Sequence, residues 1–154
     1  MIAVLQRVSR ASVIADGVFC GEIGRGLVVL LGVAQGDTEA DAEKLSRKIA
    51  GCRIFPDEAG RMNRSVTDVT GGILVVSNFT LLANYAHGNR PDFFAAAAPD
   101  VAQPLYEKFL SFLRPSFSAF ACGVFGADME IDMKADGPVT LVMDSRVLSA
   151  GGTK

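Results

Sequence analysis

The chain has 154 residues, of which 49% are apolar and 21% are charged, a balance typical of one globular domain with a sizeable core. Its formal net charge of −2 and isoelectric point of about 5.3 argue against binding to nucleic acid through bulk charge. No segment approaches the roughly 18 unbroken apolar residues of a membrane span, and the start lacks the basic and apolar regions of a signal peptide. We therefore expect a cytoplasmic protein that does not enter membranes.

Three strands are predicted at the start of the chain. Val and Ile recur from Ile2 to Ala15, and Asp16-Gly17 then provides a tight turn into a second strand over Val18 to Ile23. The run from Leu27 to Val33 is continuously apolar, as expected for a strand that is covered on both faces.

Two helices are predicted. The first begins at Thr38-Glu39-Ala40-Asp41, a pattern close to a capping box, and ends near Gly51. The second begins near Pro99-Asp100, because proline suits the first helical position, and Pro115 ends it. Helical spacing places on the buried faces Ala42, Leu45 and Ile49 in the first helix, and Val101, Leu105, Phe109 and Phe112 or Leu113 in the second.

The remaining apolar runs predict further strands. They cover Arg53–Phe55, Ile73–Ser77, Phe117–Val124, Met129–Met133 and Val139–Met143. Polar residues from Asn84 to Asp92 predict a loop, and the small polar residues 149–154 predict a frayed tail. The order of three strands, a helix, two strands, a helix and three strands predicts one mixed α/β domain over residues 1–148, built from packed layers.

The sequence offers little for metal binding or thiol chemistry. Cys20, Cys52 and Cys122 are far apart and odd in number, and His87 is the only histidine, so no usual spacing of zinc ligands occurs. We expect three reduced thiols that pack as small apolar side chains, with no metal and no cofactor.

Motifs of well-known catalytic sites are also absent. The chain has no GxSxG, GxGxxG, Walker or HExxH pattern. A conventional hydrolase with Ser77 or Cys122 as nucleophile stays open as an alternative, and it would have to use His87 as its base.

Two polar segments are better candidates for a site. Ser77-Asn78-Phe79-Thr80-Leu81 follows a buried strand, where a sheet can present side chains and backbone N–H groups to a ligand. Asp136-Gly137-Pro138-Val139-Thr140 opens the last strand with a rigid corner that exposes two carbonyl groups. Each segment also has an ordinary explanation, namely a strand end whose polar groups are satisfied, and a type II turn.

Together these segments resemble the two signature motifs of the D-aminoacyl-tRNA deacylase (D-tyrosyl-tRNA deacylase) family, SQFTL and NxGPVT. Further landmarks of the family follow in the same order from residue 1 to about residue 145. They are Val4–Val13, Gly21–Leu27, Arg53–Phe55, Met62-Asn63, Arg90-Pro91 and Phe125–Met129. The resemblance implies the family's fold, which is a single mixed sheet, partly barrel-like, with two main helices.

The resemblance also implies an activity, hydrolysis of the ester bond of D-aminoacyl-tRNA, and with it a proofreading role in translation. In the family the 2′-hydroxyl of the terminal adenosine assists hydrolysis, and the protein mainly positions the ester and supplies backbone donors. Ser77, Phe79 and Thr80 are accordingly expected to hold the adenosine and the reacting carbonyl. An older view makes Thr80 the nucleophile, although no neighbouring base is evident. A glycyl ester, which is achiral, would also be accepted.

Substrate-binding residues follow from the same resemblance. Asn78 stands at a contact position of the first motif, and Phe125 and Met129 are expected to line the adenosine pocket. Gly137-Pro138 is expected to be a cis step that enters the active site of the other subunit of a homodimer. Its parallel carbonyls would bind the α-amino group and leave no volume for an L side chain.

Three positions depart from the family pattern. Asn78 replaces glutamine, Ala135 replaces asparagine, and Asp92 replaces serine. These changes keep two alternatives open. One is an enzyme of the same fold, with a trans Gly-Pro step and a roomier pocket, that removes mischarged L-amino acids. The other is a nucleic-acid-binding dimer without catalytic activity.

Overall fold

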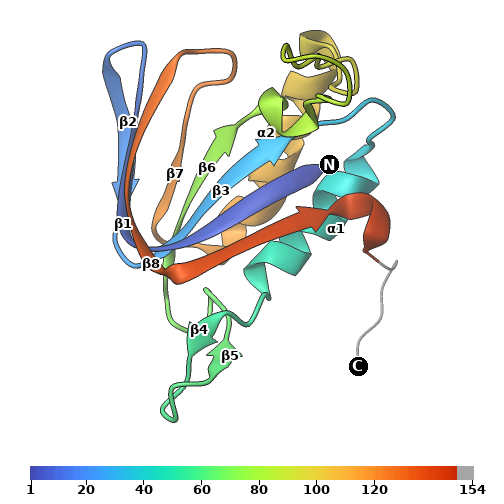
Figure 1. Cartoon of the computed structure of the whole chain (residues 1–154). Helices are drawn as coiled ribbons and strands as arrows, with labels where there is room; N and C mark the ends of the chain where they lie inside the picture. The colour runs from blue at the N-terminus through green and yellow to red at the C-terminus, as the bar shows by residue number, and fades with distance from the viewer. Residues whose placement is uncertain (149–154) are drawn as a thin grey trace.

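The main sheet is organised around a long first strand (Figure 1). The structure is a computed structural model, and it describes residues 1–148. The tail expected at 149–154 lies outside the described residues. The strands are β1 (Ile2–Ala15), β2 (Val18–Ile23), β3 (Gly26–Gly32), β4 (Phe55–Pro56), β5 (Met62–Arg64), β6 (Gly72–Ser77), β7 (Phe120–Cys122) and β8 (Met129–Asp144). The helices are α1 (Glu39–Ala50) and α2 (Pro99–Leu113), with short 3-10 helices η1 (Phe79–Leu82), η2 (Arg114–Ser116) and η3 (Ser145–Val147).

The main sheet curves until it is nearly closed. Its order is β2-β1-β3-β6-β7, with β8 paired to the other side of β1. β3, β6 and β7 are parallel neighbours, whereas the pairs of β1 are antiparallel. β2 returns to β7 so closely that a Cβ added at Gly21 would lie 3.0 Å from the Cβ of Ala121. The predicted fold class, a mixed and partly barrel-like sheet with two main helices, is therefore confirmed.

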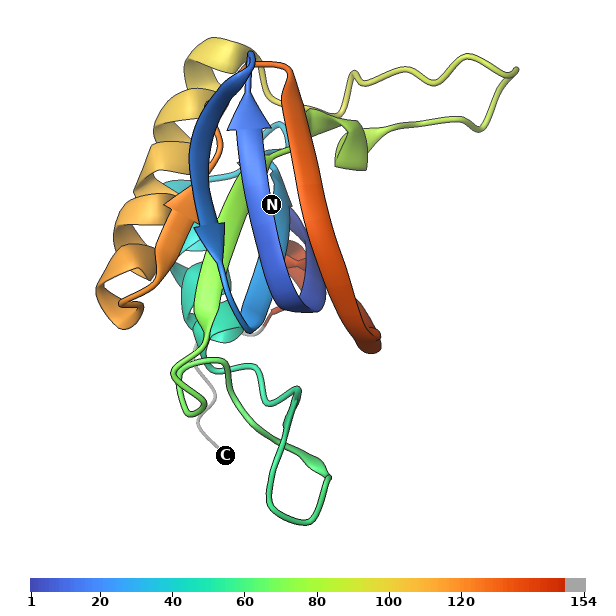
Figure 2. The ribbon, with the colours of Figure 1, turned by 90° about the vertical axis from the view of Figure 1, so that its left-hand side faces the viewer.

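Both faces of β3 and β6 are buried, as their unbroken apolar runs predict. Alternate side chains of a strand point to opposite faces, so Leu27 and Val29 pack toward α1 and α2 while Val28 packs into the sheet's hollow. The helices lie together on one side of the sheet (Figure 2). Two apolar clusters result, and the parallel strands separate them.

The helices begin and end near the predicted residues. In α1 the carboxylate of Asp41 accepts the N–H and hydroxyl of Thr38 at 3.0 and 2.9 Å, which stabilises the first turn. Ala42, Leu45 and Ile49 are buried as expected. The predicted face of α2 was right in part: Phe109 and Leu113 are buried, whereas Val101 is 49% exposed, and Ala102 and Tyr106, which were not predicted, are the other buried residues. Neither α1 nor α2 is long and apolar enough to cross a membrane.

Several predicted strand boundaries were wrong. The expected strands Met129–Met133 and Val139–Met143 are two parts of the continuous β8, which bends where its pairing with β1 is irregular. The Gly137-Pro138 peptide bond at that bend is cis. The strand expected at Phe117–Val124 shrinks to β7, because only Phe120–Cys122 pair with β6. The strand expected at Arg53–Phe55 is the small β4–β5 hairpin, whose second strand was not predicted.

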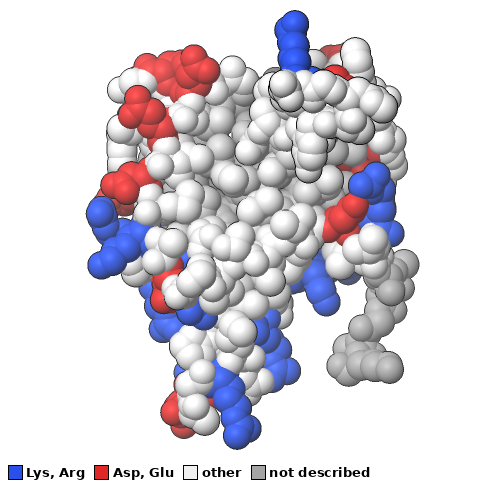
Figure 3. All heavy atoms as spheres, viewed as in Figure 1, with Lys and Arg blue, Asp and Glu red and all other residues white. Residues whose placement is uncertain are grey.

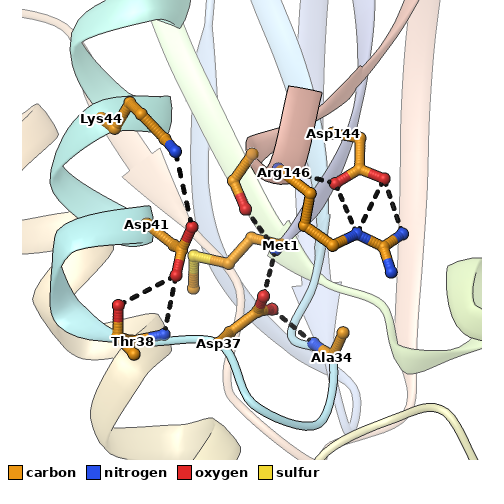
Figure 4. A network of polar contacts seen from close by, with 9 residues as sticks. Met1, Ala34, Asp37, Thr38, Asp41, Lys44, Asp144 and Arg146 are labelled. Atoms are coloured by element: carbon orange, nitrogen blue, oxygen red, sulfur yellow. Dashed lines mark hydrogen bonds and ion pairs between the residues drawn. The ribbon is translucent and has the colours of Figure 1, made fainter. Parts of the chain in front are cut away.

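The N-terminal amino group anchors β1 to the neighbouring elements (Figure 4). The ammonium of Met1 lies 2.6 Å from a carboxylate oxygen of Asp37 and donates to the hydroxyl of Ser145 at 2.7 Å. The other oxygen of Asp37 accepts the N–H of Ala34 at 2.6 Å. The Met1 side chain is fully buried and that of Asp37 is 4% exposed, so the pair is shielded from water.

This ion pair predicts a strong effect of Asp37→Ala on stability. Removal of one partner of a buried pair leaves an uncompensated charge, so we expect the free energy of unfolding to fall by about 3 kcal/mol. Urea unfolding at neutral pH measures the change. Asp132→Ala is the matched control, because its pair with Arg10 is 3.8 Å long and exposed, and it should cost less than about 1 kcal/mol. Equal effects of the two substitutions would contradict the assignment.

Candidate functional site

A cavity of about 530 Å³ opens at the carboxyl ends of the parallel strands β3 and β6. Ser77, Asn78 and Phe79 line it from the end of β6, and Phe125 and Met129 line it from the segment between β7 and β8. Five of the predicted site residues therefore meet in one place. Other lining residues are Leu31, Val33, Phe93, Ala96, Ala97, Pro99, Ala102, Tyr106, Gly126, Ala127 and Asp128.

The end of β6 turns sharply into η1. The N–H of Asn78 donates to the carbonyl of Leu31 at 2.7 Å, which extends the pairing with β3 by one residue. The amide oxygen of Asn78 then accepts the N–H of Thr80 at 3.1 Å and also its hydroxyl. Asn78 therefore caps η1, and Thr80 is exposed and lies outside the lining of the cavity.

Aromatic side chains form one wall. The ring of Phe79 meets that of Phe93 edge to face, with centroids 5.0 Å apart, and 58% of Phe79 is still exposed. Phe93 ends a protruding loop whose two sides are joined by reciprocal backbone hydrogen bonds of 2.9 Å between Asn84 and Asp92. Figure 2 shows this loop extending from the sheet. An apolar ring or base that enters the cavity would meet the face of Phe79.

The opposite wall comes from the turn between β7 and β8. Met129 packs against Gly123, and a Cβ at position 123 would lie only 2.3 Å from the Met129 sulfur. Glycine at this position therefore leaves room for the Met129 side chain. Gly126 adopts a φ of +79°, which favours glycine, and so reverses the chain next to Phe125. Asp128 is the only charged residue in the lining, and its N–H donates to the carboxylate of Asp16 at 3.1 Å.

Tyr106 is the clearest lining residue that sequence reasoning missed. Its hydroxyl donates to the buried carbonyl of Val75 at 3.3 Å. Burial raises the pKa of Tyr106 far above its usual value, so the phenol stays neutral and serves as a wall of the cavity. The signal that could have found it is the face of α2 that contains Ala102, Phe109 and Leu113, whose spacing is equally helical.

The groups that a conventional hydrolase needs are not assembled. Burial raises the pKa of the Cys122 thiol, which opposes formation of a thiolate at neutral pH. His87 is exposed in the loop from Asn84 to Asp92 and does not line the cavity beside Ser77. Within residues 1–148 no three His, Cys, Asp or Glu side chains are grouped to hold a metal ion. What the cavity presents is therefore mostly apolar walls, with Ser77, Asn78 and Asp128 as its polar side chains.

The Gly137-Pro138 step lies far from the cavity of its own chain. Beside this step, Ala135 of β8 pairs with Val8 of β1, which in turn pairs with Gly26 at the start of β3. Ser77, in contrast, pairs with Leu31 at the end of β3. Five residues of β3 separate the two levels, which is about 16 Å along the strand at about 3.3 Å per residue. Gly137 and Pro138 are both exposed. The two predicted motifs are therefore not brought together within one chain.

Comparisons with known proteins agree with the resemblance drawn from the motifs. The family model described as D-Tyr-tRNA(Tyr) deacylase matches residues 4–144. The D-aminoacyl-tRNA deacylase of Geobacter metallireducens is 52% identical over 151 residues, which cover 98% of this chain and 100% of that protein. The one from Opitutus terrae is 56% identical over 150 residues, which cover 94% and 97%.

Two solved structures share the fold. The c-Myc DNA Unwinding Element Binding Protein superposes with a TM-score of 0.87 at 42% identity, covering 94% of this chain and 98% of the other. A probable eukaryotic D-amino acid tRNA deacylase superposes with a TM-score of 0.81 at 17% identity, covering 92% and 97%. At 17% identity, the second comparison supports a shared fold and nothing further.

The cap formed by Asn78 predicts a local effect of its removal. Loss of a side-chain cap costs about 1 kcal/mol, so we expect Asn78→Ala to speed hydrogen exchange of the Thr80 amide about fivefold. Nuclear magnetic resonance measures this rate. Asn78→Asp keeps the acceptor and should retain the protection. If exchange is unchanged in Asn78→Ala, Asn78 does not hold η1 in solution.

Proposed function

The chain belongs to the D-Tyr-tRNA(Tyr) deacylase family, and we propose that it hydrolyses the ester bond of D-aminoacyl-tRNA to a free D-amino acid and tRNA. The enzyme is thus a hydrolase that proofreads chirality in translation, in the cytoplasm. The observation that carries the proposal is the cavity in which Ser77, Asn78 and Phe79 face Phe125 and Met129. Its apolar walls fit a terminal adenosine, and its open side admits the rest of an RNA chain.

Catalysis in this cavity depends on positioning. An aminoacyl ester is already activated, and the neighbouring 2′-hydroxyl of the adenosine assists attack on its carbonyl, so the protein does not need a strong nucleophile. Among the described residues, the N–H of Phe79 has no protein acceptor, which makes it available to the oxygen that becomes negative in the transition state. Ser77 stands beside it at the end of β6 and holds the ester in place.

Adenosine binding is assigned to the two apolar walls. Phe125 and Met129 contact the base from one side, and Phe79 contacts it from the other. The amide oxygen of Asn78 accepts hydrogen bonds from Thr80 and so holds η1 in place. The NH₂ group of Asn78 stays available to the ligand. The Asn78 side chain is one methylene shorter than the glutamine of the family motif.

Chirality selection is assigned to Gly137-Pro138 of a second subunit. The step is exposed and lies at the opposite end of β3 from its own cavity, which supports insertion into a partner in a homodimer. Its carbonyls accept the α-amino group, while the backbone fills the space that an L side chain needs. A D side chain points toward solvent, so many D-amino acids are accepted, and glycine is not sterically excluded.

The alternatives predict different substrates. An editing enzyme for mischarged L-amino acids needs a roomier pocket, and Asn78 and Ala135 keep that alternative open. A nucleic-acid-binding dimer without catalysis is suggested by the relative that is called a DNA unwinding element binding protein. The thiol pKa of Cys122 and the place of His87 disfavour a conventional hydrolase.

The proposal predicts selective hydrolysis of the D-ester. With enzyme far below substrate, we expect D-Tyr-tRNA to be hydrolysed at least about 100-fold faster than L-Tyr-tRNA, which corresponds to about 2.7 kcal/mol of steric exclusion. Acid-precipitable radiolabel followed over time measures both rates. Similar rates for both esters would favour the L-editing alternative. Hydrolysis of neither ester, with tight and salt-dependent binding of duplex DNA, would favour the non-catalytic alternative.

The positioning role predicts that Thr80→Ala retains turnover. Removal of a true nucleophile costs roughly 10⁴-fold or more in kcat, whereas loss of one hydroxyl that bonds Asn78 should cost less than about tenfold, near 1.4 kcal/mol. Steady-state kinetics with D-Tyr-tRNA measures the change, and circular dichroism checks folding. His87→Ala serves as the second variant and should leave kcat unchanged. A folded Thr80→Ala protein that binds tRNA without hydrolysis would restore Thr80 as nucleophile.

A further inference from the structure

Basic side chains are concentrated around the β4–β5 hairpin, although the whole chain carries a net charge of −2. Residues 47–64 contain five basic residues and two acidic ones. The basic residues are Arg47, Lys48, Arg53, Arg61 and Arg64, and Arg25 adds a sixth charge over the ring of Phe55 at 5.3 Å. Figure 3 shows blue side chains over this lower end, and red ones at the upper left. We call Arg25, Arg53, Arg61 and Arg64 the basic hairpin surface.

Within residues 1–148, Arg64 is the one member of the basic hairpin surface in salt-bridge contact with a carboxylate. Hydrogen bonds from Ser65, together with the charges of Arg53 and Arg64, lower the pKa of Asp68. Asp57 is used inside the turn, where it accepts the backbone N–H groups of Ala59 and Arg61 at 2.9 and 3.0 Å. The backbone N–H of Arg61 is the main reason that the pKa of Asp57 lies below its usual value. Arg64 pairs with the exposed Glu58 at 3.0 Å. In the described part of the chain, Arg53 and Arg61 have no carboxylate in salt-bridge contact.

The cavity, in contrast, has no basic residue in its lining. Asp128 is its only charged residue, and Asp16 lies beside it through a hydrogen bond of 3.1 Å. Glu130 and Asp132 follow at the start of β8. An RNA chain carries one negative charge per nucleotide and is held mainly through its phosphates. The lining of the cavity therefore offers no cation to the backbone that adjoins a bound RNA end.

The basic hairpin surface is fixed to the Gly137-Pro138 corner. Arg7 donates to the carbonyl of Ile54 at 2.7 Å and lies 3.0 Å from the carboxylate of Asp136, the residue before the corner. Phe55 is fully buried beside this contact. Arg7 is only 11% exposed, so it ties the hairpin and the corner into one unit. A partner that receives the corner therefore lies close to the base of the hairpin.

We propose that the basic hairpin surface of one subunit binds the phosphates of the tRNA strand whose 3′ end occupies the cavity of the other subunit. The inference rests on the proposed function, in which the corner of one subunit enters the partner's cavity. The partner then supplies the positive charge that the cavity lacks. Arg61 and Arg64 stand at the exposed tip and second strand of the hairpin and contact the phosphates on the 5′ side of the terminal nucleotide.

The first test neutralises the hairpin and compares two substrates. We expect the double variant Arg61→Gln, Arg64→Gln to raise KM for D-Tyr-tRNA about tenfold near 0.1 M salt, with kcat unchanged. The slope of log KM against log salt should fall by about two, one for each lost phosphate contact. D-tyrosyl adenosine, which lacks the RNA chain, should be hydrolysed as by the parent. The matched control is Arg10→Gln, Lys108→Gln, which removes two exposed charges outside the hairpin.

Heterodimers test whether the hairpin acts across the interface. Ala127→Trp fills the cavity of one subunit, and its homodimer is first shown to be inactive. In the first heterodimer, this subunit is paired with one that carries only the hairpin changes. The working cavity of the second subunit then faces the intact hairpin of the first, so KM should equal that of the parent. When both sets of changes are on the same subunit and the other is unchanged, the working cavity faces a neutral hairpin, and KM should rise.

The outcomes separate this inference from the proposed function. If the parent hydrolyses D-Tyr-tRNA and the hairpin variant shows the same KM and salt slope, the basic hairpin surface does not bind tRNA. The reverse pattern in the two heterodimers, or an active monomer, would overturn the cross-subunit assignment while ester hydrolysis stands. If the parent hydrolyses no D-ester, the proposed function itself fails, and the inference fails with it.

Discussion

The parallel pairing of β3 and β6 is the constraint on which the rest of the structure depends. Their starts approach so closely that a Cβ at Gly26 would lie 2.0 Å from the carbonyl oxygen of Gly72, so the pairing requires glycine at position 26, and a Cβ at Gly72 would lie 2.9 Å from the Cβ of Ile23. Both faces of the pair are buried, one against the helices and one inside the curved sheet. Only the strand ends can then reach a ligand, and the carboxyl ends of such strands are where α/β sheets bind theirs. Ser77 and Asn78 lie at that end for this reason.

The same constraint explains why the site is chemically plain. Side chains from the middle of a strand that is buried on both faces cannot act on a substrate, so the chemistry is left to the turn after β6. Asn78 shapes that turn by accepting from Thr80, and the N–H of Phe79 remains available. Backbone donors held by a rigid turn need no reorganisation when charge develops on the substrate. An activated ester with its own neighbouring hydroxyl is a reaction for which such a site is sufficient.

Much of this fold could be predicted from the sequence, and its errors have physical reasons. Unbroken apolar runs identified β3 and β6, because both faces must be apolar there, and Asp41 marked the start of α1. The face of α2 was predicted only in part: Phe109 and Leu113 were expected, but Ala102 is small and Tyr106 is polar, so their burial was not. Cavity residues such as Phe93 could not be predicted, since a loop places them through contacts that are distant in sequence. The family motifs identified the segments, but spacing alone could not show that the Gly137-Pro138 step lies at the far end of β3.

Because the cavity and the Gly137-Pro138 step of one chain lie at opposite ends of β3, the proposed mechanism uses two subunits. One subunit provides the adenosine pocket and the ester-binding turn, whereas its partner provides the Gly137-Pro138 corner and, with it, the basic hairpin surface. The ion pair of Arg7 with Asp136 and its hydrogen bond to Ile54 connect the corner to the base of that hairpin. In this proposal, recognition of the amino acid's chirality and attraction of the RNA backbone come from the same subunit, opposite the one that holds the ester. A net acidic protein can in this way bind a polyanion, because the charge that matters is the partner's local charge at the cavity and not the sum over the chain.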